Sequence, residues 1–285
     1  MAVVYLGDRF LPAELAQVPV TDPGYLLGDG VFATLRGYDG ACFRPERHLA
    51  ALVRGAEALG LPLPMPAAVM AEIADEAARR TGEAIAYVRV TLARGSQDRP
   101  SVLSLLARAY DVPTDDQYER GIPTTVVGPR RIPPECFAPG FKSTSYAAQL
   151  VARREANARG ASEGIQLAID GALACGTMSN LFVVRGRELV TPPLATGCRE
   201  GITRGAVLEL AEQAGLVARE GRLEPNDLFE ADEAFFTSTR VECLGIASVD
   251  GRPIGNLANA RSTRALRKAL RELALRETSS RRASP

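Results

Sequence analysis

Short glycine-containing turns between apolar runs most constrain what this chain of 285 residues can fold into. They occur in both halves of the chain, at Gly7-Asp8, Asp39-Gly40, Asp170-Gly171 and Arg185-Gly186. Such a turn between two alternating apolar runs is typical of a β-hairpin. We therefore expect antiparallel strands in both halves, which excludes an all-helical fold. The hydrophobic content of 46% is sufficient for a substantial core.

Segments with helical periodicity alternate with these strands, at 44–61, 66–82, 143–160 and 201–216. Between the halves, residues 111–122 are polar and contain Pro and Gly, which predicts an interdomain linker. The predicted class is α/β, with an α+β N-terminal domain over residues 1–110 and an α/β C-terminal domain over residues 123–285. Residues 275–285 are polar and basic, so we expect this end to fray.

Composition argues against several classes of function. Basic and acidic residues are equal in number, at 34 each, so no long-range attraction to nucleic acid or to a membrane surface is expected. No apolar run is long enough to span a bilayer and no secretory signal is visible, which predicts a soluble cytoplasmic protein. Five widely spaced cysteines and one histidine, His48, predict neither a metal site nor a disulfide framework. We expect His48 to be structural.

The segment "GFKSTSYAAQL" contains Lys142, one of only two lysines among the 34 basic residues. One interpretation is a solvated lysine at the start of a helix. The other depends on what distinguishes lysine from arginine. A desolvated lysine amine can lose its proton and form a Schiff base with a carbonyl, whereas a guanidinium effectively cannot. The residues themselves leave both interpretations open.

Two further stretches could bind an anion. In "GCREGITRGAVLELA", residues Gly201, Ile202 and Thr203 begin a helix, whose first amides and positive end attract a phosphate. In "FFTSTRVE", three hydroxyl residues at 237–239 precede Arg240. Each stretch alone is equally consistent with an ordinary element end. A Schiff-base lysine combined with two phosphate-binding stretches would suit pyridoxal phosphate (PLP).

Five motifs in order resemble the class IV aminotransferases, the fold-type IV group of PLP enzymes. They are "GDGVFA", "KSTSYAAQLVARREA", "CGTMSNLF", "EGITR" and the Thr-Ser-Thr of residues 237–239. The resemblance runs from about residue 2 to about residue 255. It implies a fold-type IV architecture of two domains with PLP between them, a small amino or keto acid substrate, and a homodimer in which the partner helps to close each site.

The resemblance also implies roles for individual residues. Lys142, in the C-terminal domain, would form the Schiff base with PLP and then move the α-proton of the substrate. The residues implied to hold the cofactor are Asn180, Ile202, Thr203 and Thr239, and those implied to face the substrate are Phe32, Tyr87, Arg89 and Arg99. The arginine at 99 is half of an Arg-x-His pattern, because Ser101 replaces the histidine.

Three positions depart from the family pattern. Cys175 replaces the glutamate that keeps the pyridine nitrogen protonated, Ala51 replaces an arginine that binds the phosphate, and Ala33 replaces the glutamate of "GDGVFE". Either Arg54 or Arg240 could supply the missing phosphate charge.

Three functions remain after these observations. The first is a PLP-dependent aminotransferase, or a lyase that eliminates pyruvate from an aminodeoxychorismate-type substrate. The second is an enzyme on the same scaffold that works without PLP and uses Lys142 as an amine base or as a carbonyl or anion binder. The third is a non-catalytic binding relative, which would not need a reactive amine.

Overall fold

The computed structural model describes residues 2–96, 101–136, 141–255 and 260–283, and divides into two compact units. Unit 1 comprises Met1–Asp111, Phe141–Tyr146 and Leu273–Pro285, and unit 2 comprises Val112–Gly140 and Ala147–Glu272. Both units combine helices with sheets, so the predicted α/β class is confirmed. None of the helices in the described ranges has the length and apolar character needed to cross a membrane.

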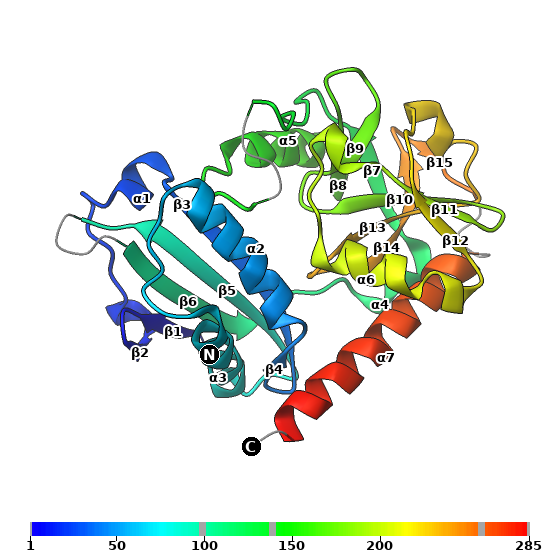
Figure 1. Ribbon diagram of the computed structural model, residues 1–285. Helices are drawn as coiled ribbons and strands as arrows, with labels where there is room; N and C mark the ends of the chain where they lie inside the picture. The colour runs from blue at the N-terminus through cyan, green and yellow to red at the C-terminus, as the bar shows by residue number, and fades with distance from the viewer. Residues whose placement is uncertain (1, 97–100, 137–140, 256–259, 284–285) are drawn as a thin grey trace. The chain divides into compact units, whose positions relative to one another are not determined.

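Unit 1 contains a six-stranded sheet in the order β2-β1-β6-β5-β3-β4, with α2 and α3 against one face (Figure 1). Its strands are β1 (Val3–Leu6), β2 (Arg9–Pro12), β3 (Gly30–Tyr38), β4 (Ala41–Cys42), β5 (Ile85–Arg94) and β6 (Ser101–Ala109). Its short helices at the N-terminal end are η1 (Ala13–Leu15) and α1 (Pro23–Leu27), and its longer ones are α2 (Pro45–Ala58) and α3 (Ala67–Thr81).

The sheet and helices of unit 1 pack through alternate residues of the strands. Leu35 of β3 and Val88 of β5 lie in one cluster with Leu49 of α2 and Met70 of α3, and all four are fully buried. The β3–β4 turn has positive φ angles of 47° at Asp39 and 88° at Gly40, as the sequence pattern predicts for a tight hairpin. The alternate residues of β3 and β5 therefore project from the face that α2 and α3 leave uncovered.

The C-terminal end of the chain is helical, where the sequence predicts fraying. Helix α7 runs over Arg261–Ala283, and its last turns belong to unit 1. Glu277 pairs with Arg44 at 3.1 Å, and Arg281 pairs with Asp75 at 2.8 Å. Asp75 is largely buried and also accepts a hydrogen bond from the Cys42 amide, so these pairs hold the polar terminus in place. Sequence polarity alone does not reveal such partners.

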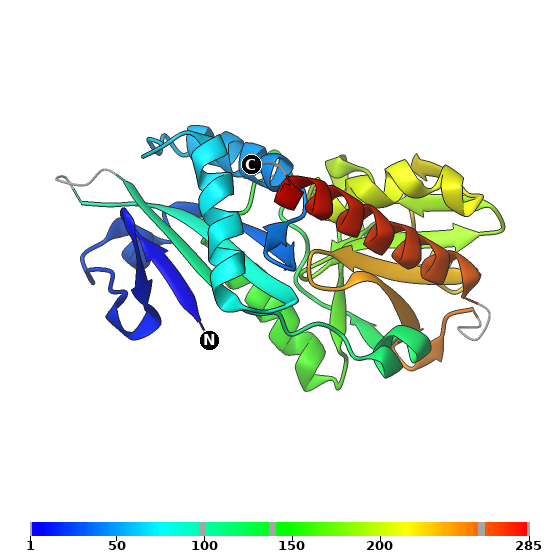
Figure 2. The same cartoon turned by 90° about the horizontal axis from the view of Figure 1, so that it is seen from below.

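Unit 2 contains a nine-stranded sheet whose main path is β12-β11-β10-β13-β14-β7-β8-β9, with β15 paired to β14. The strands are β7 (Ile122–Val126), β8 (Glu163–Leu167), β9 (Leu173–Gly176), β10 (Asn180–Arg185), β11 (Glu188–Thr191), β12 (Val217–Glu220), β13 (Glu233–Ser238), β14 (Glu242–Val249) and β15 (Arg252–Pro253). The helices are α4 (Asp115–Arg120), α5 (Ala147–Ala158), η2 (Leu194–Thr196), α6 (Ile202–Leu210), η3 (Glu212–Ala214) and η4 (Pro225–Leu228). Figure 2 shows these elements from a second direction.

The segment around Lys142 differs from the prediction. Residues 143–160 were expected to be one helix of the C-terminal domain, but α5 begins only at Ala147 and Phe141–Tyr146 belongs to unit 1. The Phe32 amide donates to the Lys142 carbonyl at 2.8 Å, and Val31 forms an antiparallel bridge with Ser143. These pairs between residues far apart in the sequence hold the backbone of the segment beside β3, in place of a helix. The predicted linker likewise contains the helix α4.

Candidate active site

The uncovered face of the unit 1 sheet holds three of the four predicted substrate residues, and one of them, Phe32, lies beside Lys142. Phe32, Tyr87 and Arg89 lie on neighbouring strands, and the Arg89 guanidinium carbon is 3.7 Å from the centre of the Phe32 ring. The half-buried Lys142 side chain places its Nζ 5.2 Å from the same ring centre. Tyr146 also contacts this ring, edge to face at 5.4 Å. The sequence interpretation missed Tyr146, although it lies within the quoted lysine motif.

His48 is buried in unit 1 and carries no charge at neutral pH. Burial, together with the positive charge of Lys142, lowers the pKa of His48 from 6.5 to about 3. A neutral imidazole near Lys142 does not add to the positive charge around the amine. The structure therefore supports the structural role that the sequence predicts for this histidine.

This shift predicts how stability depends on pH. Between about pH 3 and pH 6.5 the unfolded chain binds a proton at His48 and the folded chain does not. The contribution of His48 is therefore complete above pH 6.5 and is lost as the pH falls, by about 1.4 kcal/mol of unfolding free energy per pH unit. Urea unfolding from pH 7 to pH 4.5 measures this slope. The slope should be shallower in a His48→Gln variant, and an equal slope would contradict the assignment.

The N-terminus of α6 in unit 2 is built around Gly201 and Asn180. A Cβ on Gly201 would lie 2.2 Å from Oδ1 of Asn180, so a larger residue there would have to displace the Asn180 side chain. The Asn180 amide nitrogen donates to the Arg199 carbonyl at 2.8 Å. Ile202 and the buried Thr203 then begin the helix. This arrangement presents the first amides of α6 as donors for an anion, as the sequence predicts.

The end of β13 lies next to Asn180. Thr237 is paired with Asn180 across the β10–β13 ladder, and Thr239 follows the strand in a half-buried position. The Thr237 hydroxyl is completely buried and makes no hydrogen bond with any described residue. Because this oxygen has no accessible surface, a ligand at the N-terminus of α6 does not reach it in this arrangement. The sequence interpretation named the Thr-Ser-Thr stretch but assigned the phosphate contact only to Thr239.

Cys175 is buried in β9, and its thiol is neutral. Burial raises its pKa to about 12, and the nearby positive charges of Arg131 and Arg199 oppose that rise without cancelling it. Its side chain packs with Ala168, Ala174 and Cys198. A thiolate that replaces the family carboxylate is therefore excluded at neutral pH. This end of the site offers a neutral group where the family pattern has a charge.

The structure places the remaining residues of the sequence prediction in several different environments. Ala33 is buried in the core of unit 1. The change from glutamate to alanine at this position therefore alters core packing, although the sequence motif suggested a residue of the site. Ala51 is half-buried on α2, and Arg54 is exposed on the same helix. Arg240 lines a cavity in unit 2 that is described below. Arg99 lies outside the described residues.

Each unit carries groups that suit one part of a PLP molecule. In unit 2 the α6 amides and the Thr203 hydroxyl match a phosphate group, and in unit 1 the Lys142 amine matches the aldehyde. Cys175 does not supply the carboxylate that would protonate a pyridine nitrogen. The available groups therefore suit the phosphate and the aldehyde of PLP, but they lack the carboxylate that the family pattern places at the ring nitrogen.

Comparisons with known proteins agree on one family. Residues 30–249 match the family described as Amino-transferase class IV. The chain is 31% identical over 279 residues to a putative branched-chain-amino-acid aminotransferase of Methanocaldococcus jannaschii, covering 95% of this chain and 96% of that protein. It is also 31% identical to the D-alanine aminotransferase of Bacillus licheniformis, covering 98% and 99%, and to the aminodeoxychorismate lyase of Bacillus subtilis, covering 87% of each.

Solved structures agree with this result. The branched-chain amino acid aminotransferase of Escherichia coli superposes with a TM-score of 0.91 at 26% identity, covering 97% of this chain and 95% of that chain. A second branched-chain amino acid aminotransferase, solved with pyridoxamine 5′-phosphate, gives a TM-score of 0.90 at 26% identity, covering 96% and 94%. Class IV aminotransferases use PLP and act on small amino or keto acids. The chain belongs to the class IV aminotransferase family and is an enzyme of the aminotransferase or lyase type.

Proposed function

We propose that this enzyme binds PLP covalently through Lys142 and transforms an amino acid or an aminodeoxychorismate-type substrate. The observation that carries the proposal is the position of Lys142. Its backbone is paired to β3, and its amine lies beside Phe32 on the same sheet face as Arg89. A lysine held in this way keeps a fixed direction, which a solvated lysine at a helix start would not. PLP supplies an electron sink for the bonds at the substrate α-carbon.

The residues of the chain then have distinct tasks. The Lys142 amine would hold the cofactor by its aldehyde, with loss of water, and would accept and return the proton of the substrate α-carbon. The amides of α6 from Ile202 onward, with the hydroxyls of Thr203 and Thr239, would bind the phosphate. Arg89 faces the substrate and offers a guanidinium to its carboxylate, and the Phe32 ring supports that guanidinium from one side.

Transamination and pyruvate elimination both begin with removal of the same α-proton. An assay of the PLP-loaded enzyme separates them, because amino transfer to a keto acid and release of pyruvate are measured independently. Adding PLP to the purified chain should produce the near-visible absorption of protein-bound cofactor. Failure to produce that absorption at saturating PLP would overturn the proposal and favour the alternative in which Lys142 acts without PLP.

The proposed assembly is a homodimer, supported by an apolar surface on unit 1. Between residues 15 and 27 the exposed fractions are 63% for Leu15, 73% for Val20, 71% for Tyr25, 62% for Leu26 and 75% for Leu27. Large apolar side chains exposed together in one short segment are typical of an interaction surface. A second copy of this chain is the proposed occupant, because the family resemblance implies a partner subunit that helps to close each site.

Charging this surface should separate the subunits. In a Leu26→Glu/Leu27→Glu double variant, each subunit would have to bury two carboxylates in the interface, so we expect the molecular mass from light scattering to halve. Leu63→Glu provides a control, because Leu63 is a partly exposed leucine elsewhere in unit 1 and its replacement should leave the mass unchanged. A wild-type chain that is monomeric at micromolar concentration would contradict the assembly.

A further inference from the structure

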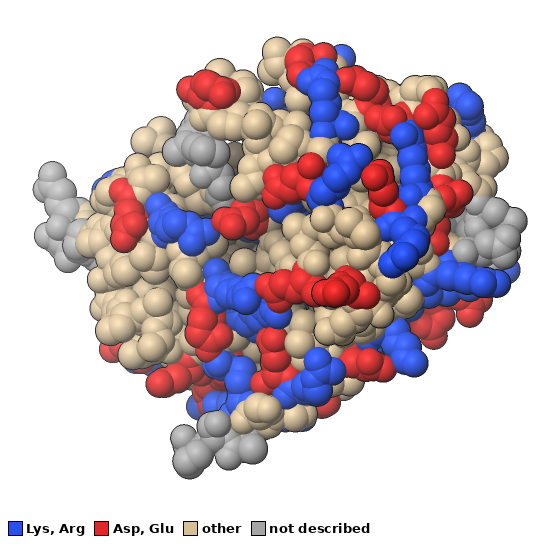
Figure 3. All heavy atoms as spheres, turned by 45° about the vertical axis from the view of Figure 1, so that its right-hand side comes forward, with Lys and Arg blue, Asp and Glu red and all other residues tan. Residues whose placement is uncertain are grey.

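Glu163 is a buried carboxylate of unit 2 to which the proposed function gives no task. Acidic and basic side chains are interspersed over the face of the molecule in Figure 3, and exposed pairs of this kind contribute little to stability. Glu163, by contrast, is only 7% exposed in β8. Because burying a charge is costly unless it is paired and hydrogen-bonded, the partners of this carboxylate show what it holds in place.

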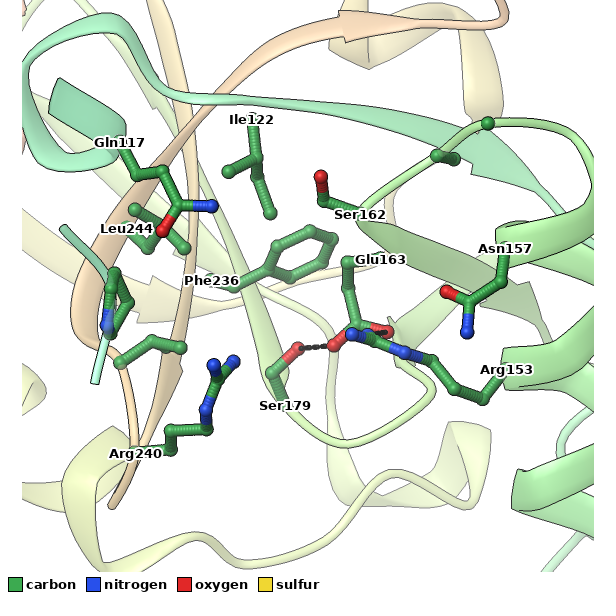
Figure 4. A pocket seen from close by; sticks show the side chains of 14 residues that line it. Gln117, Ile122, Arg153, Asn157, Ser162, Glu163, Ser179, Phe236, Arg240 and Leu244 are labelled. Carbon is green, nitrogen blue, oxygen red and sulfur yellow. Dashed lines mark hydrogen bonds and ion pairs between the residues drawn. The ribbon is translucent and has the colours of Figure 1, made fainter. Parts of the chain in front are cut away.

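Most of the hydrogen bonds that Glu163 accepts come from the turn between β9 and β10. Its Oε1 accepts from the Thr177 amide at 3.2 Å and from the Thr177 hydroxyl, and its Oε2 accepts from the Ser179 hydroxyl at 3.5 Å. Oε1 also accepts from the Gly164 amide at 3.0 Å and pairs with Nη1 of Arg153 at 2.9 Å. Figure 4 shows Arg153 and Ser179 reaching the carboxylate from two sides. The carboxylate therefore ties the turn to β8 and α5.

A cavity of about 460 Å³ lies beside this turn (Figure 4). Its lining includes Glu163 and Ser179, together with Arg240 of the turn between β13 and β14. Ser179 is half-buried, and Met178 of the same turn is 38% exposed. A segment with few packing contacts on one side is held in position mainly by its hydrogen bonds, and here these include the bonds to Glu163.

The same turn leads into Asn180, the first residue of β10. The Asn180 side-chain amide and the Gly201 backbone amide both donate to the Arg199 carbonyl, at 2.8 and 2.9 Å. Gly201 directly precedes α6 and has no side chain with which to cap the first amides of that helix. The direction of these amides is therefore set by the contacts that hold the backbone ahead of the helix, and Asn180 supplies one of them.

We propose that Glu163 is a positioning residue for the phosphate site at the N-terminus of α6. The carboxylate holds Thr177 and Ser179, and the turn that they form places Asn180 against the backbone ahead of α6. Glu163 acts through this series of contacts and does not itself touch the ligand. The inference deepens the proposed function and rests on its assignment of the cofactor phosphate to α6.

The ratio of the affinities for PLP and for pyridoxal tests the inference, because pyridoxal has the ring and the aldehyde but no phosphate. Both compounds are titrated by absorbance into the full chain. In Glu163→Ala we expect PLP to lose about tenfold or more in affinity relative to pyridoxal, since displaced amides lose a charge-assisted hydrogen bond to the phosphate. Glu163→Gln retains one acceptor oxygen, so it should give a smaller change in the same direction, and it serves if the alanine variant does not fold.

Glu233→Ala is the matched control. Glu233 is 6% exposed, and it accepts hydrogen bonds from the amides of Ser262 and Thr263 and from the Thr263 hydroxyl, at the start of α7. Its loss removes a buried acceptor of the same kind without changing the β9–β10 turn. We expect the melting temperature to fall in both alanine variants, and the PLP-to-pyridoxal ratio to fall only in Glu163→Ala. An equal fall of the ratio in both would show a general loss of stability and overturn the inference.

Two outcomes separate this inference from the proposed function. If the wild-type chain shows the cofactor absorption and every folded Glu163 variant keeps the wild-type ratio, the inference alone is overturned. Binding of inorganic phosphate to the chain without PLP, followed by phosphorus NMR, gives the second outcome. If the wild type shows no cofactor absorption but binds phosphate more tightly than Glu163→Ala does, the proposed function alone is overturned. Equal wild-type affinities for PLP and pyridoxal would overturn both.

Discussion

Replacing Lys142 by alanine is expected to abolish the near-visible absorption of bound PLP and to lower turnover by about a thousandfold or more. The amine is both the proposed covalent attachment point and the proposed carrier of the α-proton, and loss of a positioned acid–base group alone costs about 10²–10⁴-fold. The measurement is a PLP titration monitored by absorbance, followed by assays of amino transfer and pyruvate release.

Lys268→Ala is the matched control for that variant. Lys268 is the only other lysine, and its side chain is 79% exposed, 3.9 Å from Glu272 in an exposed helical pair. Removing it should leave absorption and turnover unchanged, because exposed pairs of this kind contribute little. If Lys142→Ala also kept the absorption, Lys142 would not be the required attachment point.

Replacing Cys175 by glutamate is expected to make the protein less stable without PLP and to make PLP bind about ten to a hundred times more tightly. Cys175 is 5% exposed and packs among alanines and Cys198, so a carboxylate there is poorly solvated. Because the positive charges of Arg131 and Arg199 offset the effect of burial only in part, the new charge should lower the melting temperature by about 5 °C or more. A protonated pyridine nitrogen would supply a further cationic partner and gain a charge-assisted hydrogen bond.

The measurement compares melting temperatures and equilibrium dialysis with and without PLP. Cys175→Gln controls for size, because its amide fills similar space without a charge. The increase in melting temperature on adding PLP should be larger in the glutamate variant than in both the glutamine variant and the wild type. Equal PLP affinities for the glutamate and glutamine variants would show that position 175 does not face the ring nitrogen.

Local sequence signals predicted the elements of the fold well. The Gly7-Asp8 turn joins β1 to β2, and the Asp39-Gly40 turn joins β3 to β4, because turn residues and alternating apolar runs specify a hairpin without help from distant residues. Predictions that depended on non-local partners were less accurate. Phe141–Tyr146 was assigned to the wrong unit because its backbone pairs with β3, more than a hundred residues earlier in the chain.

The candidate site shows the same division. Motif order singled out Lys142, Asn180 and Thr203 as candidate site residues, whereas the contact of the Tyr146 ring with Phe32 is visible only in three dimensions. The sequence also grouped Ala33 with the site residues, although its side chain faces the core.

Covalent capture of the cofactor tests the central role of Lys142 most directly. The PLP-loaded enzyme is reduced with borohydride, digested, and analysed by mass spectrometry. Our account predicts that the phosphopyridoxyl mass appears on the peptide that contains Lys142, and that the Lys268→Ala variant gives the same labelled peptide. Label on the Lys268 peptide or on the N-terminal amine, with the Lys142 peptide unmodified, would contradict the account.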